Sequence, residues 1–267
     1  MLYFVATPIG NLKDITLRAL ETLKAVDVIA CEDTRHTLKL LNFYDIKKPL
    51  IAYHKFNENT EAPKIMEMLN SGKNVAVVSD AGMPVISDPG NKLTKLLADN
   101  GVDFTVVPGA NAGLSALILS GMDADKFCFY GFLDENKYRK INLEKYKDVT
   151  CSLIFYVAPH NLKADIKDVY SVFGERKACL VKEITKIHEK AIRFNLSEFP
   201  DVEEKGEFVM IVEGASEKEN PLLALSEKEH IDYYINGGMS KMDALKKVAK
   251  ERGVAKNSLY KFTIEGD

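Results

Sequence analysis

The 267-residue sequence is poor in the patterns that bind metal ions or crosslink secreted chains. Its four cysteines (Cys31, Cys128, Cys151 and Cys179) are widely spaced and form no C-x-x-C pair, and its five histidines show no metal-ligand spacing. Each cysteine lies in or beside an apolar segment, which favours reduced core thiols over a disulfide framework or a zinc site. We therefore expect no metal.

Long hydrophobic runs are also absent. No stretch of eighteen apolar residues occurs, so we expect no membrane span. The N-terminus leads directly into a strand-like segment and has no basic region or cleavage site, so we expect a cytoplasmic protein. The length and the 46% hydrophobic content allow two modest domains, and the net charge of −3 identifies no partner.

The glycine fingerprints of common nucleotide enzymes are missing. No G-x-G-x-x-G follows the first apolar run and no G-x-x-x-x-G-K-S/T occurs, which argues against a standard dinucleotide site or a P-loop. What the sequence does have is three turns of small residues and proline, at residues 8–11, 81–84 and 108–112, each after an expected strand. Such turns suit a flat, partly apolar ligand held by main-chain hydrogen bonds and one or two carboxylates.

The central stretch is residues 74–90. Residues 75–78 are apolar and mostly β-branched, which is typical of a strand buried on both faces. Ser79-Asp80 ends this run, and Asp88-Pro89-Gly90 predicts the start of a helix with Asp88 as N-cap. In open α/β sheets, ligands bind at this carboxyl edge of the strands.

Strand-like and helix-like patterns alternate in the first half of the chain. Five strands are expected at residues 2–6, 26–30, 50–53, 75–78 and 104–107. Helical periodicity lies between them, so the sequence predicts a parallel α/β domain over residues 1–122.

A second domain is expected over residues 123–215. Strands are predicted at residues 127–132, 153–157, 178–184, near 191–194 and at 208–212, with a helix at 162–173. Because few crossover helices separate these strands, we expect a mixed sheet.

Residues 216–267 are expected to form a polar linker and a basic helical tail. Ser240 is a helix N-cap candidate, with Met242, Leu245 and Val248 on one face and Gly253 after the end, and a shorter helix is expected through Leu259. From residue 240 to 261, six lysines and one arginine face two carboxylates, an excess of five positive charges. This tail suits either contact with a nucleic-acid backbone or a solvated hairpin packed on the core.

Six motifs resemble those of one family. They are V-A-T-P-I-G-N-L-K-D-I-T-L-R-A-L (5–20), E-D-T-R-H-T (32–37), S-D-A-G-M-P-V-I-S-D-P-G (79–90), P-G-A-N-A (108–112), K-E-I-T-K-I-H-E (182–189) and K-G-E (205–207). In this order and spacing they resemble the tetrapyrrole methylase superfamily. Within it they resemble the branch that methylates the 2′-hydroxyl of a cytidine in small-subunit ribosomal RNA.

The resemblance implies two α/β domains with S-adenosylmethionine in the cleft between them, usually in a homodimer, and ribosomal RNA or the small ribosomal subunit as partner. The cofactor contacts that it implies are Pro8, Ile9, Asp80, Met83, Asn111, Ala112, Tyr156, Lys182 and Gly214.

The catalytic candidates are Glu183, Lys186, Glu32 and Arg35. A ribose hydroxyl is a poor nucleophile, so transfer needs positioning and a base. We expect Glu183 on a strand, as the base that accepts the proton, with lysine and arginine contacting phosphate or hydroxyl. In the alternative, Glu183 is structural and paired with Lys186 or Arg35.

Some positions depart from the family pattern. Met83 replaces the usual threonine, and residues 156–161 (Y-V-A-P-H-N) lack a carboxylate and a guanidinium that the family has there. Two other functions therefore stay open: a methyltransferase of the same fold that acts on a tetrapyrrole, and an RNA-binding homologue with impaired catalysis. The basic tail disfavours the first, and the intact cofactor loops disfavour the second.

Overall fold

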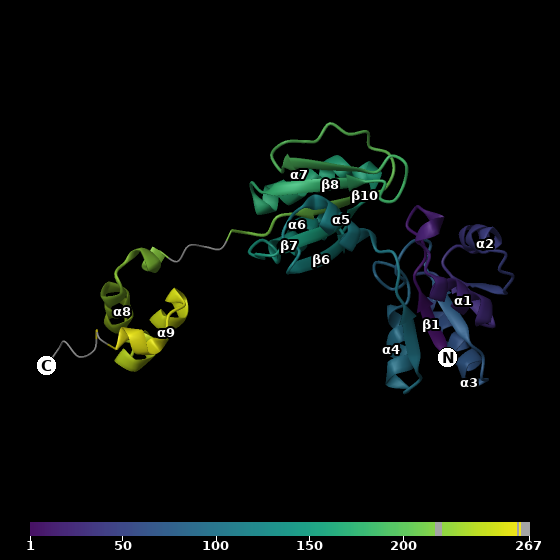
Figure 1. The fold of residues 1–267 in the computed structure, drawn as a ribbon, viewed down its shortest axis with the longest axis horizontal. Coiled ribbons are helices and arrows are strands. Elements are labelled where there is room, and N and C mark those ends of the chain that lie inside the picture. The colour runs from purple at the N-terminus through teal and green to yellow at the C-terminus, as the bar shows by residue number, and fades with distance from the viewer. Residues whose placement is uncertain (217–220, 261, 263–267) are drawn as a thin grey trace. The chain divides into compact units, whose positions relative to one another are not determined.

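The computed structural model describes residues 1–216, 221–260 and 262, and it divides the chain into two units, Met1–Ala215 and Ser216–Asp267 (Figure 1). The larger unit contains two five-stranded sheets. The predicted boundary near residue 122 falls between these sheets. None of the helices within the described ranges is long and apolar enough to cross a bilayer.

The first sheet contains the five strands that the sequence predicts. They are β1 (Leu2–Val5), β2 (Val28–Cys31), β3 (Leu50–Ala52), β4 (Val75–Val78) and β5 (Phe104–Val107). Their order is β3-β2-β4-β1-β5, and every pairing is parallel. The ends of β1 and β4 are therefore adjacent at one edge, which is where the site is built.

Helices cover both faces of this sheet. They are α1 (Leu17–Ala25), α2 (Thr34–Phe43), α3 (Glu58–Asn70) and α4 (Asn91–Asp99), and a short 3₁₀ helix η1 (Leu12–Asp14) precedes α1. Because side chains alternate along a strand, Val75 and Val77 of β4 pack on the α3–α4 side, whereas Ala76 and Val78 pack on the α1–α2 side. Burial on both faces explains why this strand is an unbroken apolar run.

The second sheet is mixed, as predicted. Its strands are β6 (Phe127–Phe132), β7 (Ser152–Val157), β8 (Lys177–Lys182), β9 (Lys190–Asn195) and β10 (Phe208–Val212). Their order is β6-β7-β10-β8-β9, with β6 parallel to β7 and the other pairs antiparallel. The predicted extension of β8 beyond Lys182 is wrong, because Glu183 and Thr185 adopt φ angles of 54° and 67° in a turn.

Three helices and a 3₁₀ turn pack on the second sheet: α5 (Ala112–Ser120), α6 (Asn136–Glu144), η2 (Pro159–Asn161) and α7 (Leu162–Phe173). α6, which the sequence analysis missed, and α7 cover one face. α5 covers the other, where Ala116 and Leu117 pack with Ile154, Cys179 and Ile211. Although α5 precedes the predicted domain boundary at residue 122, it therefore packs on the second sheet.

The smaller unit contains η3 (Pro221–Ala224), α8 (Glu227–Asn236), α9 (Lys241–Arg252) and η4 (Lys256–Leu259). Ser240 caps α9 and Gly253 ends it with φ 64°, as predicted. Met242 does not share the buried face, because it is 47% exposed, and Ala244 and Ala249 are buried there with Leu245 and Val248. The sequence analysis missed α8.

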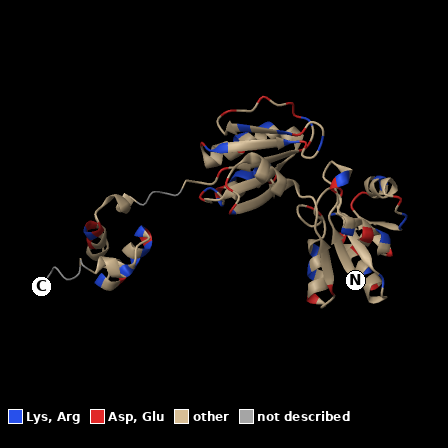
Figure 2. Ribbon diagram, in the orientation of Figure 1, with Lys and Arg blue, Asp and Glu red and all other residues tan. Residues whose placement is uncertain are grey.

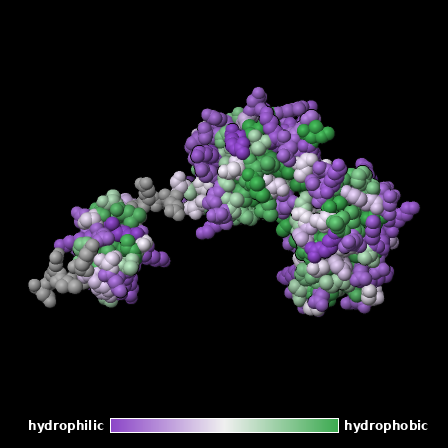
Figure 3. Space-filling view, viewed as in Figure 1, coloured by the Kyte–Doolittle hydropathy of each residue, from purple (hydrophilic) through white to green (hydrophobic). Residues whose placement is uncertain are grey.

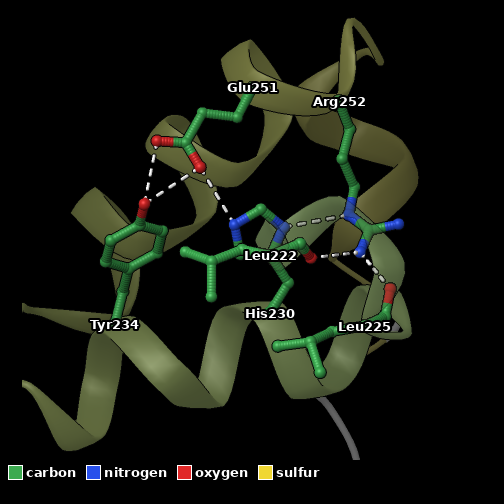
Figure 4. A network of polar contacts seen from close by, with 6 residues as sticks. All are labelled: Leu222, Leu225, His230, Tyr234, Glu251 and Arg252. Atoms are coloured by element: carbon green, nitrogen blue, oxygen red, sulfur yellow. Dashed lines mark hydrogen bonds and ion pairs between the residues drawn. The ribbon is translucent and has the colours of Figure 1, made fainter. Parts of the chain in front are cut away.

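A polar network around a fully buried histidine links these elements (Figure 4). His230 Nε2 lies 2.9 Å from Glu251 Oε2, and Arg252 Nε donates to His230 Nδ1 at 3.1 Å. Because Nδ1 accepts, the ring proton lies on Nε2 and points at Glu251. Arg252 also donates to the carbonyls of Leu222 and Leu225, so α8, α9 and the η3 segment are held together without a disulfide.

Candidate functional site

A pocket of about 350 Å³ lies within the larger unit, at the ends of β1, β4 and β7 and the start of β10. Its lining is mostly apolar and main-chain: Ile9, Ala81, Gly82, Met83, Ile86, Ser87, Asp88, Asn111, Ala112, Phe132, Tyr156, Val157, Ala158, Pro159, Val181, Ile184, Glu207, Phe208 and Val209. All three turns singled out in the sequence lie in or beside it. We call it the first pocket.

The loops after β1 and β4 are clamped together. Thr7 and Gly82 exchange backbone hydrogen bonds of 2.9 and 3.1 Å, and the Thr7 hydroxyl donates to the Ser79 carbonyl. Gly82 has φ +81°, and a Cβ there would lie 3.2 Å from Ile9 Cγ2. Glycine therefore lets this turn form and lets it approach Ile9 at the pocket wall.

The loop between β4 and α4 is strained. Val85 and Ser87 have φ angles of 76° and 66°, which non-glycine residues seldom adopt and which cluster at functional sites. The buried carboxylate of Glu58 holds the end of this loop, since its Oε1 accepts from Gly90 N at 2.7 Å. Gly90 is the N-cap of α4, so the prediction of Asp88 in that role is wrong. Asp88 instead lines the first pocket.

Carboxylates gather where β2 and β4 end. Burial, and then the charges of Glu32 and Asp80, raise the pKa of Asp88 to about 6. Burial, and then Asp80, also raise the pKa of Glu32. Asp80 Oδ1 accepts from Asp33 N at 3.2 Å, which ties the two strand ends together. Asp80 is thus occupied in shaping the loop.

A second pocket of about 340 Å³ adjoins the first and shares Ile9, Ala81 and Glu207 with it. Its lining is Thr7, Pro8, Ile9, Gly10, Leu12, His36, Lys39, Leu40, Phe43, Asp80, Ala81, Lys186 and Glu207. Three basic side chains, from His36, Lys39 and Lys186, make it chemically different from the apolar first pocket.

A charged cluster fixes the turn after β8. Glu183 Oε1 accepts from Glu207 N at 2.8 Å and from Lys186 Nζ at 3.0 Å, and Lys186 Nζ lies 3.1 Å from Glu207 Oε2. The Glu207 N–H, and then Lys186, lower the pKa of Glu183. Although partial burial opposes it, hydrogen bonding to both carboxylates raises the pKa of Lys186. Glu183 and Lys186 therefore stay charged at neutral pH.

The two pockets bring together many of the predicted site residues. Ile9, Met83, Asn111, Ala112 and Tyr156 line the first pocket, and Pro8, Ile9, Asp80 and Lys186 line the second. The Asn111 side chain also caps α5 by accepting from Leu114 N. Burial raises the pKa of Tyr156, so its phenol stays protonated beside the first pocket.

Other predicted site residues line neither of these two pockets, as far as the described residues go: Glu32, Arg35, Lys182, Glu183 and Gly214. Arg35 is exposed and paired with Asp33 at 2.8 Å. Lys182 Nζ donates to the Glu203 carbonyl. Gly214 follows the far end of β10, where a Cβ would lie 2.1 Å from Thr150 O, so this glycine permits a close backbone approach.

Sequence reasoning missed several pocket residues: Asp88 in its actual position, Phe132, Glu207, and the α2 residues His36, Lys39 and Phe43. Glu207 belongs to the K-G-E motif that the resemblance included, so a signal for it existed. The α2 residues recur at intervals of three and four, which places them on one face of a helix. Only the adjacent loops reveal that this face borders a pocket.

Two β-sheets covered by helices, with a small-molecule pocket built from the loops of both, define a two-lobed α/β protein. The model of the tetrapyrrole (corrin/porphyrin) methylases matches residues 1–200, and the chain belongs to this family. The fold and the family that the sequence analysis expected are thereby confirmed.

Curated relatives match nearly the whole chain. Ribosomal RNA small subunit methyltransferase I of Bacillus subtilis is 44% identical over 270 residues, which covers 97% of this chain and 92% of the relative. The relative of the same name from Thermotoga maritima is 42% identical over 217 residues, 80% of this chain and 98% of its own length. About a fifth of this chain therefore has no counterpart there.

A solved structure shares the fold at low identity. Uroporphyrin-III C-methyl transferase from Thermus thermophilus, complexed with S-adenyl homocysteine, superposes with a TM-score of 0.59 at 20% identity and covers 79% of this chain and 96% of its own.

Proposed function

We propose that this protein transfers a methyl group from S-adenosylmethionine to the 2′-hydroxyl of a cytidine in small-subunit ribosomal RNA, in the cytoplasm. The observation that carries the proposal is the first pocket, which is built by the loops that hold the family motifs. Relatives at 44% identity over 97% of the chain supply the acceptor class. Among the alternatives, a tetrapyrrole acceptor has no such support from relatives that match the whole chain.

The first pocket fits the cofactor. Apolar side chains such as Ile9, Met83 and Phe208 suit an adenine ring, and the main chain of Ala81 and Met83, which also line the pocket, suits its polar edge. Asp88 offers a carboxylate, ionised above about pH 6, for a cationic group. When bound, S-adenosylmethionine supplies an electrophilic methyl group on a sulfonium.

The acceptor hydroxyl has to meet that methyl group at the wall that the two pockets share. Glu207 is the carboxylate that lines both. We assign Glu207 the role of proton acceptor: it would take the proton of the hydroxyl as that oxygen bonds to the methyl carbon, while the carbon–sulfur bond breaks and leaves its electron pair on neutral S-adenosylhomocysteine. Lys186 holds the Glu207 side chain at 3.1 Å, and Glu183 holds Lys186. Glu183 and Lys186 are therefore positioning residues in this mechanism.

The proposal includes a homodimer, supported by an exposed apolar surface on α5 and β6. Ile118 is 76% exposed and Leu114 45%, and along the edge strand β6 the side chains of Phe127, Phe129 and Phe132 are all more than a third exposed. Figure 3 shows hydrophobic atoms gathered over these elements. An apolar surface of this kind on an edge strand suits a symmetric interface with a second copy.

The function is tested with labelled S-adenosylmethionine and three acceptors: small-subunit ribosomal RNA, assembled small subunits, and a tetrapyrrole. We expect label on RNA or subunits, at a single ribose 2′-oxygen that is unmodified in cells lacking the gene. Label on the tetrapyrrole alone would contradict the proposal. Cofactor binding without transfer to any acceptor would leave only the RNA-binding homologue.

A further inference from the structure

The second pocket has a wall that the proposed chemistry does not use. α2 contributes His36, Lys39, Leu40 and Phe43 to it, at spacings of three, four and seven residues, so they form one face of the helix. η1 contributes Leu12 opposite them. Of this wall, Phe43 is 60% exposed and Leu12 36%, so a flat apolar surface borders the opening.

This wall is fixed in place. The Tyr44 hydroxyl donates to the Leu12 carbonyl, which ties η1 to the end of α2. The Phe43 ring packs edge-on against Tyr44, with centroids 4.9 Å apart and an interplanar angle of 82°. The rim is therefore preorganised, and an incoming ring stacks on Phe43 with little loss of side-chain entropy.

The two lysines of the second pocket differ in their ion pairs. Lys186 is held between Glu183 and Glu207. Lys39 lies one helical turn from Phe43, and within the described parts of the chain it has no carboxylate at salt-bridge distance. An unpaired lysine beside an exposed aromatic ring on one helix face matches a phosphate next to a base.

We propose that the second pocket binds one unstacked nucleotide of single-stranded RNA, with its base on Phe43 and Leu12 and its phosphate at Lys39 and His36. Its ribose then faces the shared wall at Ile9 and Glu207. A pocket of about 340 Å³ matches a single nucleotide. The macrocycle of a tetrapyrrole with several carboxylates calls for a wider surface and more cations. This inference rests on the proposed function.

The test uses the full-length chain and small-subunit ribosomal RNA. Phe43→Ala is expected to lower kcat/KM for RNA about 5- to 150-fold, the range of one lost base stack. Phe43→Trp should restore the activity and Phe43→Leu should not, because only an aromatic face stacks. The matched control is Phe56→Ala, which removes a 94% exposed phenylalanine outside the pocket. Calorimetric affinity for S-adenosylmethionine should be unchanged in all four variants.

Lys39→Gln should weaken RNA binding and reduce the slope of log affinity against log salt by about one, as for one lost phosphate contact. If the wild-type protein methylates RNA and both Phe43→Ala and Lys39→Gln keep full activity, the assignment of the second pocket is wrong and the proposed function stands. Failure of the wild-type protein to methylate RNA would instead overturn the proposed function. Melting temperatures identify a variant that fails to fold. If Phe43→Ala fails to fold, the activities of Phe43→Leu and Phe43→Trp decide whether an aromatic ring at this position binds the base.

Discussion

Two glutamates only a few ångströms apart have different roles at the shared wall of the pockets. Glu183 is the carboxylate that the sequence favours as base, yet its Oε1 already accepts two hydrogen bonds. Glu207 lines both pockets and keeps one carboxylate oxygen toward Lys186. The assignment of each role can be tested by removing one charge at a time.

Glu207→Gln is expected to lower kcat for methyl transfer by about 10²- to 10⁴-fold, because the hydroxyl proton loses its acceptor. Cofactor affinity and melting temperature should stay near wild type. Glu183→Gln should have a smaller effect on kcat and should lower the melting temperature, because the turn after β8 loses a charged partner for Lys186. If the kinetic and thermal effects are reversed between the two variants, the roles are exchanged.

Asp88 should make stability depend on pH. The pKa of Asp88 in the folded protein is about 6, above the ordinary aspartate value of 3.8, so the folded state binds its proton more tightly than the unfolded state. The ionised form therefore destabilises the fold above about pH 6, and this cost decreases as pH falls toward 3.8. Asp88→Asn should raise the free energy of unfolding by about 1 kcal/mol at pH 7.5, a value reduced for solvent screening of a half-buried carboxylate.

Denaturant unfolding of wild type and Asp88→Asn between pH 4 and 8 measures this. The difference between the two proteins should shrink steadily as pH falls. The contribution of Glu183 to stability depends on pH in the opposite sense, because the pKa of this side chain is lowered in the folded protein. The stability that Glu183 contributes is present at neutral pH and is lost in acid. A constant difference for Asp88→Asn across the range would show that its carboxyl titrates alike in both states.

At the scale of elements, α9 has the charge pattern of a surface for RNA. Its buried face is apolar, while Lys246, Lys247 and Lys250 are exposed, and basic residues are visible along α9 in Figure 2. The unit that contains α9 has its own core of buried side chains around Leu245 and Ile231. It is therefore a separate structural unit.

Removal of residues 216–267 should leave cofactor affinity unchanged and weaken RNA binding. Phosphate contacts release counterions, so the truncated protein should also show a shallower salt dependence. The control is the full-length triple change of Lys246, Lys247 and Lys250 to glutamine, which keeps the unit and removes charge. Equal affinity and salt slope in all three proteins would reduce this unit to a packing element.

Local patterns in the sequence predicted the ten strands and most of the helices, but not α6, α8 or every boundary. Most of the strands were recognisable because they are apolar runs ended by turn residues, as at Val75–Val78. Asp88 was misassigned because an Asp-Pro-Gly sequence favours a helix start. The buried Glu58, distant in sequence, holds Gly90 and turns Asp88 toward the pocket instead. Only tertiary structure contains that contact.

The sequence predicted the site residues that lie in or beside the loops with family motifs. Ile9 and Met83 lie together because β1 and β4 are neighbouring parallel strands whose carboxyl ends share an edge, and Tyr156 joins them from β7 of the second sheet. The strand alternation expected for Glu183 failed, because the backbone turns at positive φ after Lys182. Lys39 and Phe43 carry no motif, and a helix face reveals its neighbours only once the fold is known.

At the scale of the whole molecule, the surface of α5 and β6 predicts assembly. Ile118→Asp should shift the protein from dimer to monomer in light scattering, because it places a charge in an apolar interface. Leu17→Asp is the control, since Leu17 is 79% exposed on α1. Equal masses for both variants and wild type would exclude this surface as the interface.

The two ends of strand β10 have different neighbours, and this bears on how proteins of this fold can vary. Its first residues, Phe208 and Val209, line the pocket, whereas the chain leaves the strand at the other end through Gly214 and enters the C-terminal unit. A module joined at this exit can be gained, exchanged or lost in one genetic step without altering a residue of the pocket. Proteins of this fold can then differ in the C-terminal unit while the residues of the first pocket stay the same.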